Sequence, residues 1–425
     1  MNPLVSRRQW LGGSLLLPAA LPAMLPAPAL FAQEEGQQKA GSVPVAGARA
    51  LPDRQDFPIE GTTYLDNGSQ HPISMGARQA LQTYLARRAL EPDAPPYHLD
   101  GDGIRAKFAR LINADADEIA FVQSTTAGEQ LLLHALGIPA SSAHIVTDTL
   151  HFFGSFPLYE GLAEQGCDVT WLKPVDGRIR LEDMKRAIRK DTRLVALSLV
   201  STYNGFQHDL KAVCDLAHAQ GALVYADIIH AAGCVPLDVR ASGVDFAACA
   251  SYKWLMGDFG LGFLYVRKDR QDQLKRTQFG YYGIGSFVSH SYPLDPPGEA
   301  VADYSFQKNA TGWFSFGTYS HMGAVLLDYS LDYLLATGVD RIQAHVQPMI
   351  RRLKEELPKR GFEVVTPPEA ATPIITCVYE DAATKLRPRL EAAGIKITTS
   401  RNRFRVTPSV HNDMDDIDRL LKALA

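Results

Sequence analysis

Short apolar runs alternate with amphipathic helical patterns from about residue 115 to residue 250. The runs DEIAFVQS, AHIVTDT, CDVTWL, RLVALSLVS, ALVYADI and VDFAACASY are rich in Val, Ala and aromatic residues, which predicts buried strands. The segments between them, such as AGEQLLLHAL, LEDMKRAIRK and DLKAVCDLAHAQ, have helical periodicity. This alternation predicts an α/β fold with a mostly parallel sheet and helices on both faces. GFLYVRKD follows closely and predicts an antiparallel addition.

The pattern changes after residue 276. Residues 276–312 are aromatic and rich in Gly and Pro, which predicts a long irregular connection with a functional or interface role. Two amphipathic helices (MGAVLLDYSLDYLLATG and DRIQAHVQPMIRRLKEEL), short strands (PIITCVYE and RFRVTPS) and the helix DMDDIDRLLKAL follow. We therefore expect a large domain at 76–312 and a smaller α+β domain at 313–425, to which 59–75 contributes a segment.

The first residues resemble an export signal. Arg7 and Arg8 precede an uncharged Ala/Pro-rich run, which predicts a twin-arginine signal at 1–32, use of that export machinery and a periplasmic protein. Four prolines interrupt the run, so a membrane-spanning helix or stable membrane anchor is not expected. Cleavage after Ala29 or Ala32 stays open, as does the alternative of a plain disordered leader. Residues 33–58 are expected to be a linker.

Composition narrows the class of partner. The chain has 425 residues, 46% hydrophobic content and a formal net charge of -4, which argues against nucleic acid. Its five cysteines lack paired spacing, so we expect buried small apolar side chains rather than disulfides. The histidines form no ligand-like cluster, and no metal site is expected.

Candidate catalytic residues follow the predicted strands, where ligands bind in such sheets. Lys253 follows VDFAACASY in an apolar setting, and a buried ammonium is costly. A desolvated lysine is instead a nucleophile toward aldehydes. Asp227 ends ALVYADI, with His230 three residues on, and fits either a pyridinium partner or a simple cap.

Two other strand ends complete the set. Ser124, Thr125 and Thr126 precede a helix and suit a phosphate, although Thr126 with Glu129 also fits a capping box. After AHIVTDT, an aromatic or imidazole side chain could stack on a planar ring or belong to the core. Taken together, a phosphate cradle, a ring stacker, a pyridinium partner and a reactive amine are the parts that hold pyridoxal phosphate.

These segments carry a family resemblance. YLDNGSQHP, QSTTAGEQ, YADIIHAAG, SYKWLMGDFGLGFLYV, FSFGTYS and RFRVTPSVHNDMDDIDRLL are similar to the class V aminotransferase family of fold-type I pyridoxal-phosphate enzymes. Cysteine desulfurases, kynureninases and isopenicillin N epimerase-like proteins belong to that family. The resemblance covers roughly residues 60 to 425.

The resemblance implies a role for each matching residue. Lys253 would form the internal aldimine and later act as acid and base, Asp227 would keep the pyridine nitrogen protonated, and His230 would lie near the ring. The remaining cofactor-binding candidates are Ser124, Thr125, Thr126, Thr202, Tyr252 and Thr318, together with His151 or Phe152 as the ring stacker. Thr318 would reach the phosphate of a neighbouring subunit, which implies a homodimer. Arg405 would bind the substrate α-carboxylate, with His71 and Tyr282 as further substrate-binding candidates.

The reaction type is less determined. Desulfurases of the family carry a catalytic cysteine before the terminal arginine, and AAGIKITTSRNRFRV contains none, so cysteine desulfuration is not expected. Transamination, epimerisation, elimination and decarboxylation at the α-carbon, through an external aldimine, stay open.

The export signal favours a periplasmic enzyme of the pyoverdine-tailoring branch. Such an enzyme acts on a glutamyl residue of a siderophore precursor, with Tyr281, Tyr282 and His290 lining an open site. The alternatives are an aminotransferase, epimerase or lyase for a free amino acid, and a non-catalytic binding protein with this fold.

Overall fold

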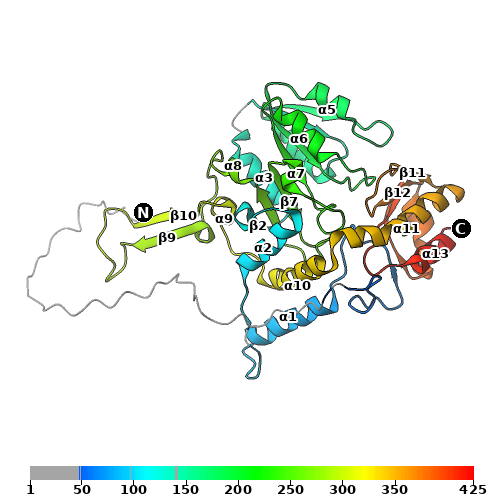
Figure 1. Ribbon diagram of the computed structural model, residues 1–425, viewed down its shortest axis with the longest axis horizontal. Coiled ribbons are helices and arrows are strands. Elements are labelled where there is room, and N and C mark those ends of the chain that lie inside the picture. Colours follow the sequence, from blue (N-terminus) through cyan, green and yellow to red (C-terminus); the bar gives the residue numbers. More distant parts are fainter. Residues whose placement is uncertain (1–46, 48, 96, 139–141) are drawn as a thin grey trace, which may run out of the picture. The chain divides into compact units, whose positions relative to one another are not determined.

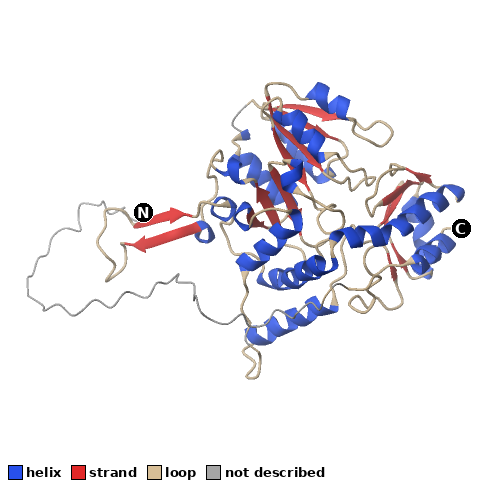
Figure 2. Ribbon diagram, in the orientation of Figure 1, coloured by secondary structure: helices blue, strands red, loops and turns tan. Residues whose placement is uncertain are grey.

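All six predicted apolar runs form strands of one central sheet. A computed structural model of the chain describes residues 47, 49–95, 97–138 and 142–425, so the predicted signal at 1–32 lies outside the described residues. The strands are β2 (Ile119–Val122), β3 (His144–Asp148), β4 (Asp168–Leu172), β5 (Thr192–Ser198), β6 (Leu223–Asp227), β7 (Phe246–Ala250) and β8 (Gly262–Val266). They lie in the order β2-β8-β7-β6-β5-β3-β4. Figure 1 labels β2 and β7 of this sheet, and Figure 2 shows its strands in red among the helices.

The sheet is parallel except at β8. β3, β4, β5, β6 and β7 pair in parallel, whereas β8 runs antiparallel to both β7 and β2, as predicted for GFLYVRKD. The carboxyl ends of the other six strands consequently meet at one edge of the sheet. The strand-end residues singled out from the sequence therefore converge there.

Helices cover both faces of the sheet because successive strand residues point to opposite sides. In β5, Val195 and Leu197 belong to one apolar core, whereas Leu194 and Ala196 belong to another. The first core includes side chains from α2 (Gly101–Ile112), α5 (Leu181–Ala187), α6 (Leu210–His218), α7 (Val239–Ser242) and α10 (His321–Thr337). The second includes side chains from α3 (Thr125–Ala135), α4 (Phe156–Glu164) and α9 (Ala310–Phe314).

A third core lies in the C-terminal part of the chain. The four-stranded sheet there has the order β11-β12-β15-β14, with β11 at Glu363–Val364, β12 at Ile375–Val378, β14 at Thr398–Ser400 and β15 at Arg403–Val406. It packs with α11 (Val339–Lys359), α12 (Ala382–Ala392) and α13 (Met414–Ala423). β1 (Thr63–Tyr64) pairs in parallel with β13 (Ile395–Lys396), which attaches the early segment to this part. The expected boundary at residue 313 would assign α10 to the smaller domain. In the structure, α10 packs in the first core with the central sheet.

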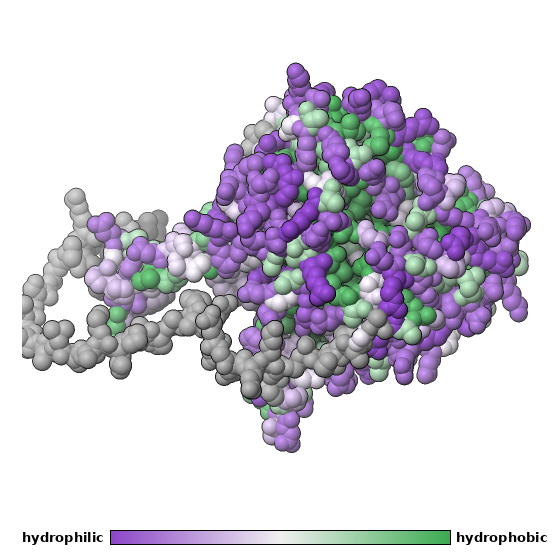
Figure 3. Space-filling model, in the orientation of Figure 1, coloured by the Kyte–Doolittle hydropathy of each residue, from purple (hydrophilic) through white to green (hydrophobic). Residues whose placement is uncertain are grey.

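Residues 276–312 contain more regular structure than predicted. After η4 (Tyr281–Gly283), the strands β9 (Ile284–Ser289) and β10 (Ala302–Phe306) form an antiparallel hairpin separate from the central sheet (Figure 1). Both faces of its middle residues are exposed, so the sequence shows no apolar–polar alternation that would have indicated strands. Apolar and polar residues both reach the surface in this part of the molecule (Figure 3).

The described end of the predicted linker is also ordered. Asp53 and Asp56 are buried and accept hydrogen bonds at 3.2 Å from the hydroxyls of Tyr333 and Tyr329 in α10. Phe57 is buried in the first core. Residues 53–57 are therefore part of the folded body, and they lead into α1 (Met75–Arg88), which packs beside α10.

No helix in the part of the chain that the structure describes is both long enough and apolar enough to cross a bilayer.

Candidate active site

Asp227 and Lys253 lie at the carboxyl ends of adjacent parallel strands. Asp227 is the last residue of β6, in register with Ala248 of β7, and Lys253 follows β7 by three residues. Their relative exposures are 4% and 6%, so both residues are almost completely removed from water. The predicted pairing of these two residues at one site agrees with this placement.

A tight turn fixes the direction of the Lys253 side chain. The Ser251 hydroxyl donates to the carbonyls of Asp258 at 2.6 Å and Leu261 at 2.9 Å, which closes the loop on which the lysine lies. Gly233 approaches this loop so closely that an added Cβ would lie 2.4 Å from the Trp254 carbonyl oxygen.

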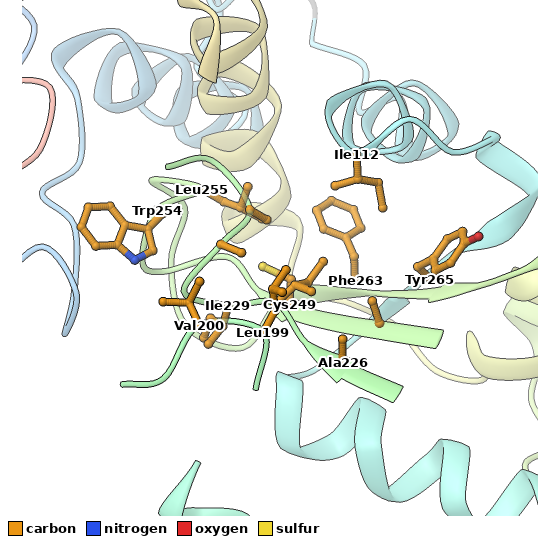
Figure 4. Close-up of a cluster of buried hydrophobic side chains, with 14 of the residues drawn as sticks. Ile112, Leu199, Val200, Ala226, Ile229, Cys249, Trp254, Leu255, Phe263 and Tyr265 are labelled. Carbon is orange, nitrogen blue, oxygen red and sulfur yellow. The ribbon is translucent and has the colours of Figure 1, made fainter. Parts of the chain in front are cut away.

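Apolar packing completes this support. Trp254 and Leu255, directly after Lys253, are fully buried with Ile229 and Cys249 in the apolar cluster of Figure 4. The lysine therefore extends from a rigid support and not from a mobile loop.

The contact between Lys253 and His230 fits the neutral form of the lysine amine. The Nε1 of Trp254 donates to Nδ1 of His230 at 3.3 Å, so this imidazole carries its proton on Nε2. That Nε2 lies 3.0 Å from Nζ of Lys253. An ammonium has only donors and would face an N–H, whereas a neutral amine accepts the bond with its lone pair.

The electrostatic environment brings the titration of the Lys253 amine close to neutral pH. Burial lowers the pKa of Lys253 from 10.5 to about 8; Asp227 opposes this shift, and Arg405 adds to it. Burial, Lys253 and Arg405 together hold the pKa of His230 well below its usual value, so that imidazole is neutral as well. With a pKa of about 8, Lys253 exchanges between ammonium and amine near neutral pH, and the amine is the form that can accept from Nε2 of His230.

Asp227 is held as a hydrogen-bond acceptor. Its Oδ2 accepts from the Ser198 hydroxyl at 3.1 Å, and its Oδ1 accepts from the Ile229 amide at 3.0 Å. Burial raises its pKa, and His151, the Ile229 amide and Lys253 oppose that rise. Each oxygen keeps a further lone pair that can accept a hydrogen bond from a ligand.

His151 and Phe152 occupy different environments. The His151 side chain is fully buried, with Nδ1 2.8 Å from the Ser198 hydroxyl and Nε2 3.0 Å from Glu129. Phe152 is half-buried, and its amide donates to the Ser198 hydroxyl at 3.1 Å. Both residues therefore contact Ser198, which is the hydrogen-bond partner of Asp227. Which of the two stacks on a cofactor ring stays a prediction.

The amino end of α3 presents hydroxyls and amides beside these residues. Ser124 is its N-cap and accepts from the Ala127 amide, while the Thr125 hydroxyl accepts from the Ala250 amide at 2.9 Å. The alternative capping box is wrong, because Glu129 turns into the core toward His151.

A cavity of about 570 Å³ opens at this helix end, and Ser124, Thr126, Gly317 and Thr318 are among its lining residues. The Thr318 hydroxyl lies 2.9 Å from that of Tyr281 in the same chain. These groups have the donors that a phosphate requires.

Arg405 reaches the site from the C-terminal part of the chain. Its guanidinium donates to the Thr202 hydroxyl at 2.6 Å and, through Nη2, to Ser69 at 2.9 Å and Thr398 at 3.2 Å. Its Nε is buried without a partner, and burial lowers its pKa. A half-buried guanidinium bonded to neutral oxygens suits a carboxylate ligand, because among the described residues no carboxylate side chain is hydrogen-bonded to it.

Three predicted site residues lie around this centre. The Tyr252 ring stacks on Phe259 with a centroid distance of 4.3 Å, and its carbonyl accepts from the His71 amide at 3.0 Å. Both ring nitrogens of His71 are already bonded, to the Pro72 carbonyl and the Ser409 hydroxyl, so its ring offers no free polar group to a substrate. Tyr282 packs against the Tyr281 and Tyr319 rings beside the cavity.

Several residues of the site were not predicted from the sequence. Each of them forms a hydrogen bond with one of the predicted residues. They are Ser198, Glu129, Trp254, Ser69 and Thr398. Ser198 carries a usable signal because, like Asp227, it ends a buried strand. Ser69 and Thr398 carry none, since Ser69 lies 336 positions from Arg405 and Thr398 belongs to a short, uniformly half-buried strand.

The residues present fit pyridoxal phosphate. An amine with a lowered pKa, a carboxylate with a free lone pair and a helix end with hydroxyls match the aldehyde, the pyridine nitrogen and the phosphate of that cofactor. The five cysteines are all buried, as expected.

The sequence and the fold of this chain were compared with those of known proteins. The profile described as Aminotransferase class-V matches residues 98–402. A "Probable cysteine desulfurase" of Methanothermobacter thermautotrophicus is 29% identical over 311 residues, which cover 71% of this chain and 74% of that protein. The apo structure of a cysteine desulfurase from Thermococcus onnurineus NA1 has a TM-score of 0.75 at 21% identity and covers 89% of this chain and 98% of that one.

A third similar structure contains the cofactor. It is a mutant of the lyase C-DES with glycine covalently linked to its PLP cofactor, with a TM-score of 0.73 at 18% identity, covering 88% of this chain and 99% of that one. Because the Aminotransferase class-V profile matches most of this chain, pyridoxal phosphate is its cofactor, as predicted.

The comparisons correct one expectation. Desulfuration was not expected because the segment before Arg405 lacks a cysteine, but relatives and fold neighbours over most of the chain are named cysteine desulfurases. That exclusion is wrong, because the absence of a residue from one loop does not separate this chain from those proteins. From residue 98 to residue 402, this chain belongs to the class-V aminotransferase family.

Proposed function

We propose that this protein is a pyridoxal-phosphate enzyme that acts on the α-amino-acid part of its substrate. The observation that carries the proposal is the buried amine of Lys253, with its pKa lowered to about 8, acted on by the buried carboxylate of Asp227 and the half-buried guanidinium of Arg405. When bound, pyridoxal phosphate supplies an electron sink for bonds next to the amino group.

The residues of the chain have separate tasks in this proposal. Arg405 binds the substrate carboxylate through a two-pronged guanidinium that Thr202, Ser69 and Thr398 hold in place. Lys253 moves protons, because an amine with a pKa of about 8 exchanges them readily near neutral pH. His230 donates to the amine and keeps it pointed at the site.

For the substrate, two candidates rest on different observations. The names of the relatives favour L-cysteine as a substrate, with release of its sulfur. The twin-arginine pattern instead supports an exported enzyme that tailors a glutamyl residue of a siderophore precursor, with the exposed hairpin beside Tyr282 giving access to a bulky molecule.

We also propose a homodimer. Thr318 lines the cavity at the start of α3 and is exposed, which supports a contact with the phosphate site of a second subunit. Light scattering on the eluting protein checks this assembly, and a monomer that binds cofactor and turns over substrate would count against it.

The first experiment is an absorbance spectrum of the purified protein with its cofactor. We expect a visible band that borohydride abolishes by fixing the cofactor to Lys253, and no such band in Lys253→Ala. Spectral shifts with L-cysteine, L-glutamate and a glutamyl peptide then rank the substrate candidates. A colourless wild-type protein that the added cofactor cannot restore would refute the proposal and favour a non-catalytic binding protein.

A further inference from the structure

Glu129 is a deeply buried carboxylate near the site that no proposed task uses. It is 2% exposed and lies in α3, on the side facing His151. Three side chains donate to it: Ser155 at 2.7 Å, Tyr159 at 2.6 Å and His151 at 3.0 Å. A carboxylate buried this completely requires a compensating charge, and His151 is the group that can supply it.

The hydrogen bonds continue from Glu129 to Asp227. His151 Nδ1 lies 2.8 Å from the Ser198 hydroxyl, and that hydroxyl lies 3.1 Å from Asp227 Oδ2. The Phe152 amide also donates to the Ser198 oxygen at 3.1 Å. Glu129, His151, Ser198 and Asp227 thus form one continuous buried chain, which we name the Glu129 relay.

Counting protons along the Glu129 relay leaves one consistent assignment. Asp227 must be an ionised acceptor to hold a protonated pyridine nitrogen, so the single proton of the Ser198 hydroxyl points to Asp227. The Ser198 oxygen then accepts from His151 Nδ1, which must carry a hydrogen. Because Nε2 of His151 donates to Glu129, both ring nitrogens are protonated and the ring is an imidazolium.

We propose that Glu129 is a positioning residue that keeps His151 an imidazolium and thereby keeps Asp227 a carboxylate directed at the cofactor. This inference rests on the proposed function, since it assigns Asp227 to the pyridine nitrogen. A neutral His151 with its proton on Nε2 would take the Ser198 proton at Nδ1. Asp227 would then face a lone pair and would keep its charge only at higher cost.

The charges around the relay are consistent with this assignment. Burial lowers the pKa of His151, but Glu129, followed by Asp227 and Asp148, outweighs burial and raises it. Burial raises the pKa of Glu129, whereas His151, Tyr159 and Ser155 outweigh it and lower that pKa. Tyr159 stays a phenol, because burial and Glu129 hold its pKa well above the usual value.

The decisive variant is Glu129→Gln, which keeps the shape and an acceptor for His151 and Tyr159 but removes the charge. With pyridoxal phosphate labelled with nitrogen-15 at the ring, we expect the nitrogen signal of the wild type to be that of a protonated pyridine. In Glu129→Gln it moves toward the unprotonated value at pH 7.5, and turnover falls at least tenfold. Tyr159→Phe removes a donor but keeps the charge, so its nitrogen signal stays like that of the wild type.

A measurement on the wild type guards against a variant that does not fold. Nitrogen-15 spectra of histidine-labelled apo-protein report His151 directly, and we expect an imidazolium with two N–H groups that persists above pH 7.5. A neutral His151 there, or an unchanged cofactor signal in a folded Glu129→Gln, would overturn the proposal. Because the apo-protein spectrum needs no bound cofactor, failure of the proposed function and failure of this inference give different results.

Discussion

At the scale of single residues, the site is built from charges whose state is set by burial and by hydrogen-bond partners. Lys253 faces the Nε2 of His230, whose other nitrogen accepts from Trp254, and this contact favours the neutral form of the amine. Asp227 and Arg405 act on that amine in opposite directions, the first raising its pKa and the second lowering it. Together with burial, these two residues set the pKa of Lys253 at about 8, so its side chain can both accept and release a proton near neutral pH.

The first prediction concerns this pair of opposing effects. In apo-protein, labelling of Lys253 by acetic anhydride should rise with pH through about 8, because only the neutral amine reacts. Asp227→Asn should move the profile to lower pH, and Arg405→Gln should move it to higher pH. Peptide mass spectrometry measures both, with the exposed Lys190 as the internal control. Shifts of the same sign in the two variants would contradict this account.

The second prediction concerns Arg405 as the carboxylate ligand. Arg405→Gln should raise KM about 10- to 100-fold for a substrate with a free α-carboxylate, since a hydrogen bond to a charged group contributes about 1.5–3 kcal/mol. Arg403→Gln is the matched control, because Arg403 lies on the same strand but is exposed. Steady-state kinetics decide the matter, and equal KM values in both variants would remove Arg405 from substrate binding.

At the scale of elements, function depends on turns that follow the parallel strands. The lysine turn after β7 is held against residues 230–233, which follow β6, so two neighbouring strands fix one reactive group. Gly233 has φ of +94°, a backbone conformation that other residues adopt only with strain. Its missing side chain is what allows the Trp254 carbonyl to approach.

The third prediction tests this close approach. Gly233→Ala should destabilise the protein by more than the roughly 1–2 kcal/mol that a left-handed backbone costs, because its Cβ would meet a carbonyl oxygen at 2.4 Å. Gly221→Ala is the control, since Gly221 has φ of +81° but open space around the added Cβ. Chemical denaturation measures both changes, and equal losses would show that the contact with Trp254 has no energetic consequence.

At the scale of the whole molecule, the C-terminal part and the segment before α1 enclose neutral histidines. The His71 and His411 rings lie 5.5 Å apart, and both contact the Phe57 ring. Burial lowers the pKa of His71 to about 3 and that of His411 to about 4. Protonating either ring would place a charge in an apolar contact between segments far apart in the chain.

The fourth prediction is a loss of stability in acid. Since these pKa values in the folded state lie below the unfolded value of 6.5, the unfolded chain binds more protons below that pH. The free energy of unfolding should therefore be constant from this source above pH 6.5 and fall as the pH drops toward 4. His411→Gln should flatten the slope of Tm against pH, whereas His98→Gln, at an exposed position, should leave it unchanged. An unaltered slope in His411→Gln would contradict the assignment.

The sequence by itself determined the elements and the central pair of the site. Strand-length apolar runs, helical periodicity and polar residues at strand ends are local signals, so the sheet, Lys253 and Asp227 could be identified without coordinates. The hairpin at 284–306 and the ordered residues 53–57 could not, because exposed strands and a packed coil leave no periodic pattern.

Only the tertiary structure decided which residues of the site contact one another. Arg405 bonds Thr202, 203 positions away, and Glu129 bonds His151, 22 positions away, through contacts that depend on the path of the chain. Protonation is decided at the same level, since the lowered pKa of Lys253 and the raised pKa of His151 follow from burial and from the groups that face these side chains. Residue type gives a side chain its possible charges, and the partners that folding brings to it select among them.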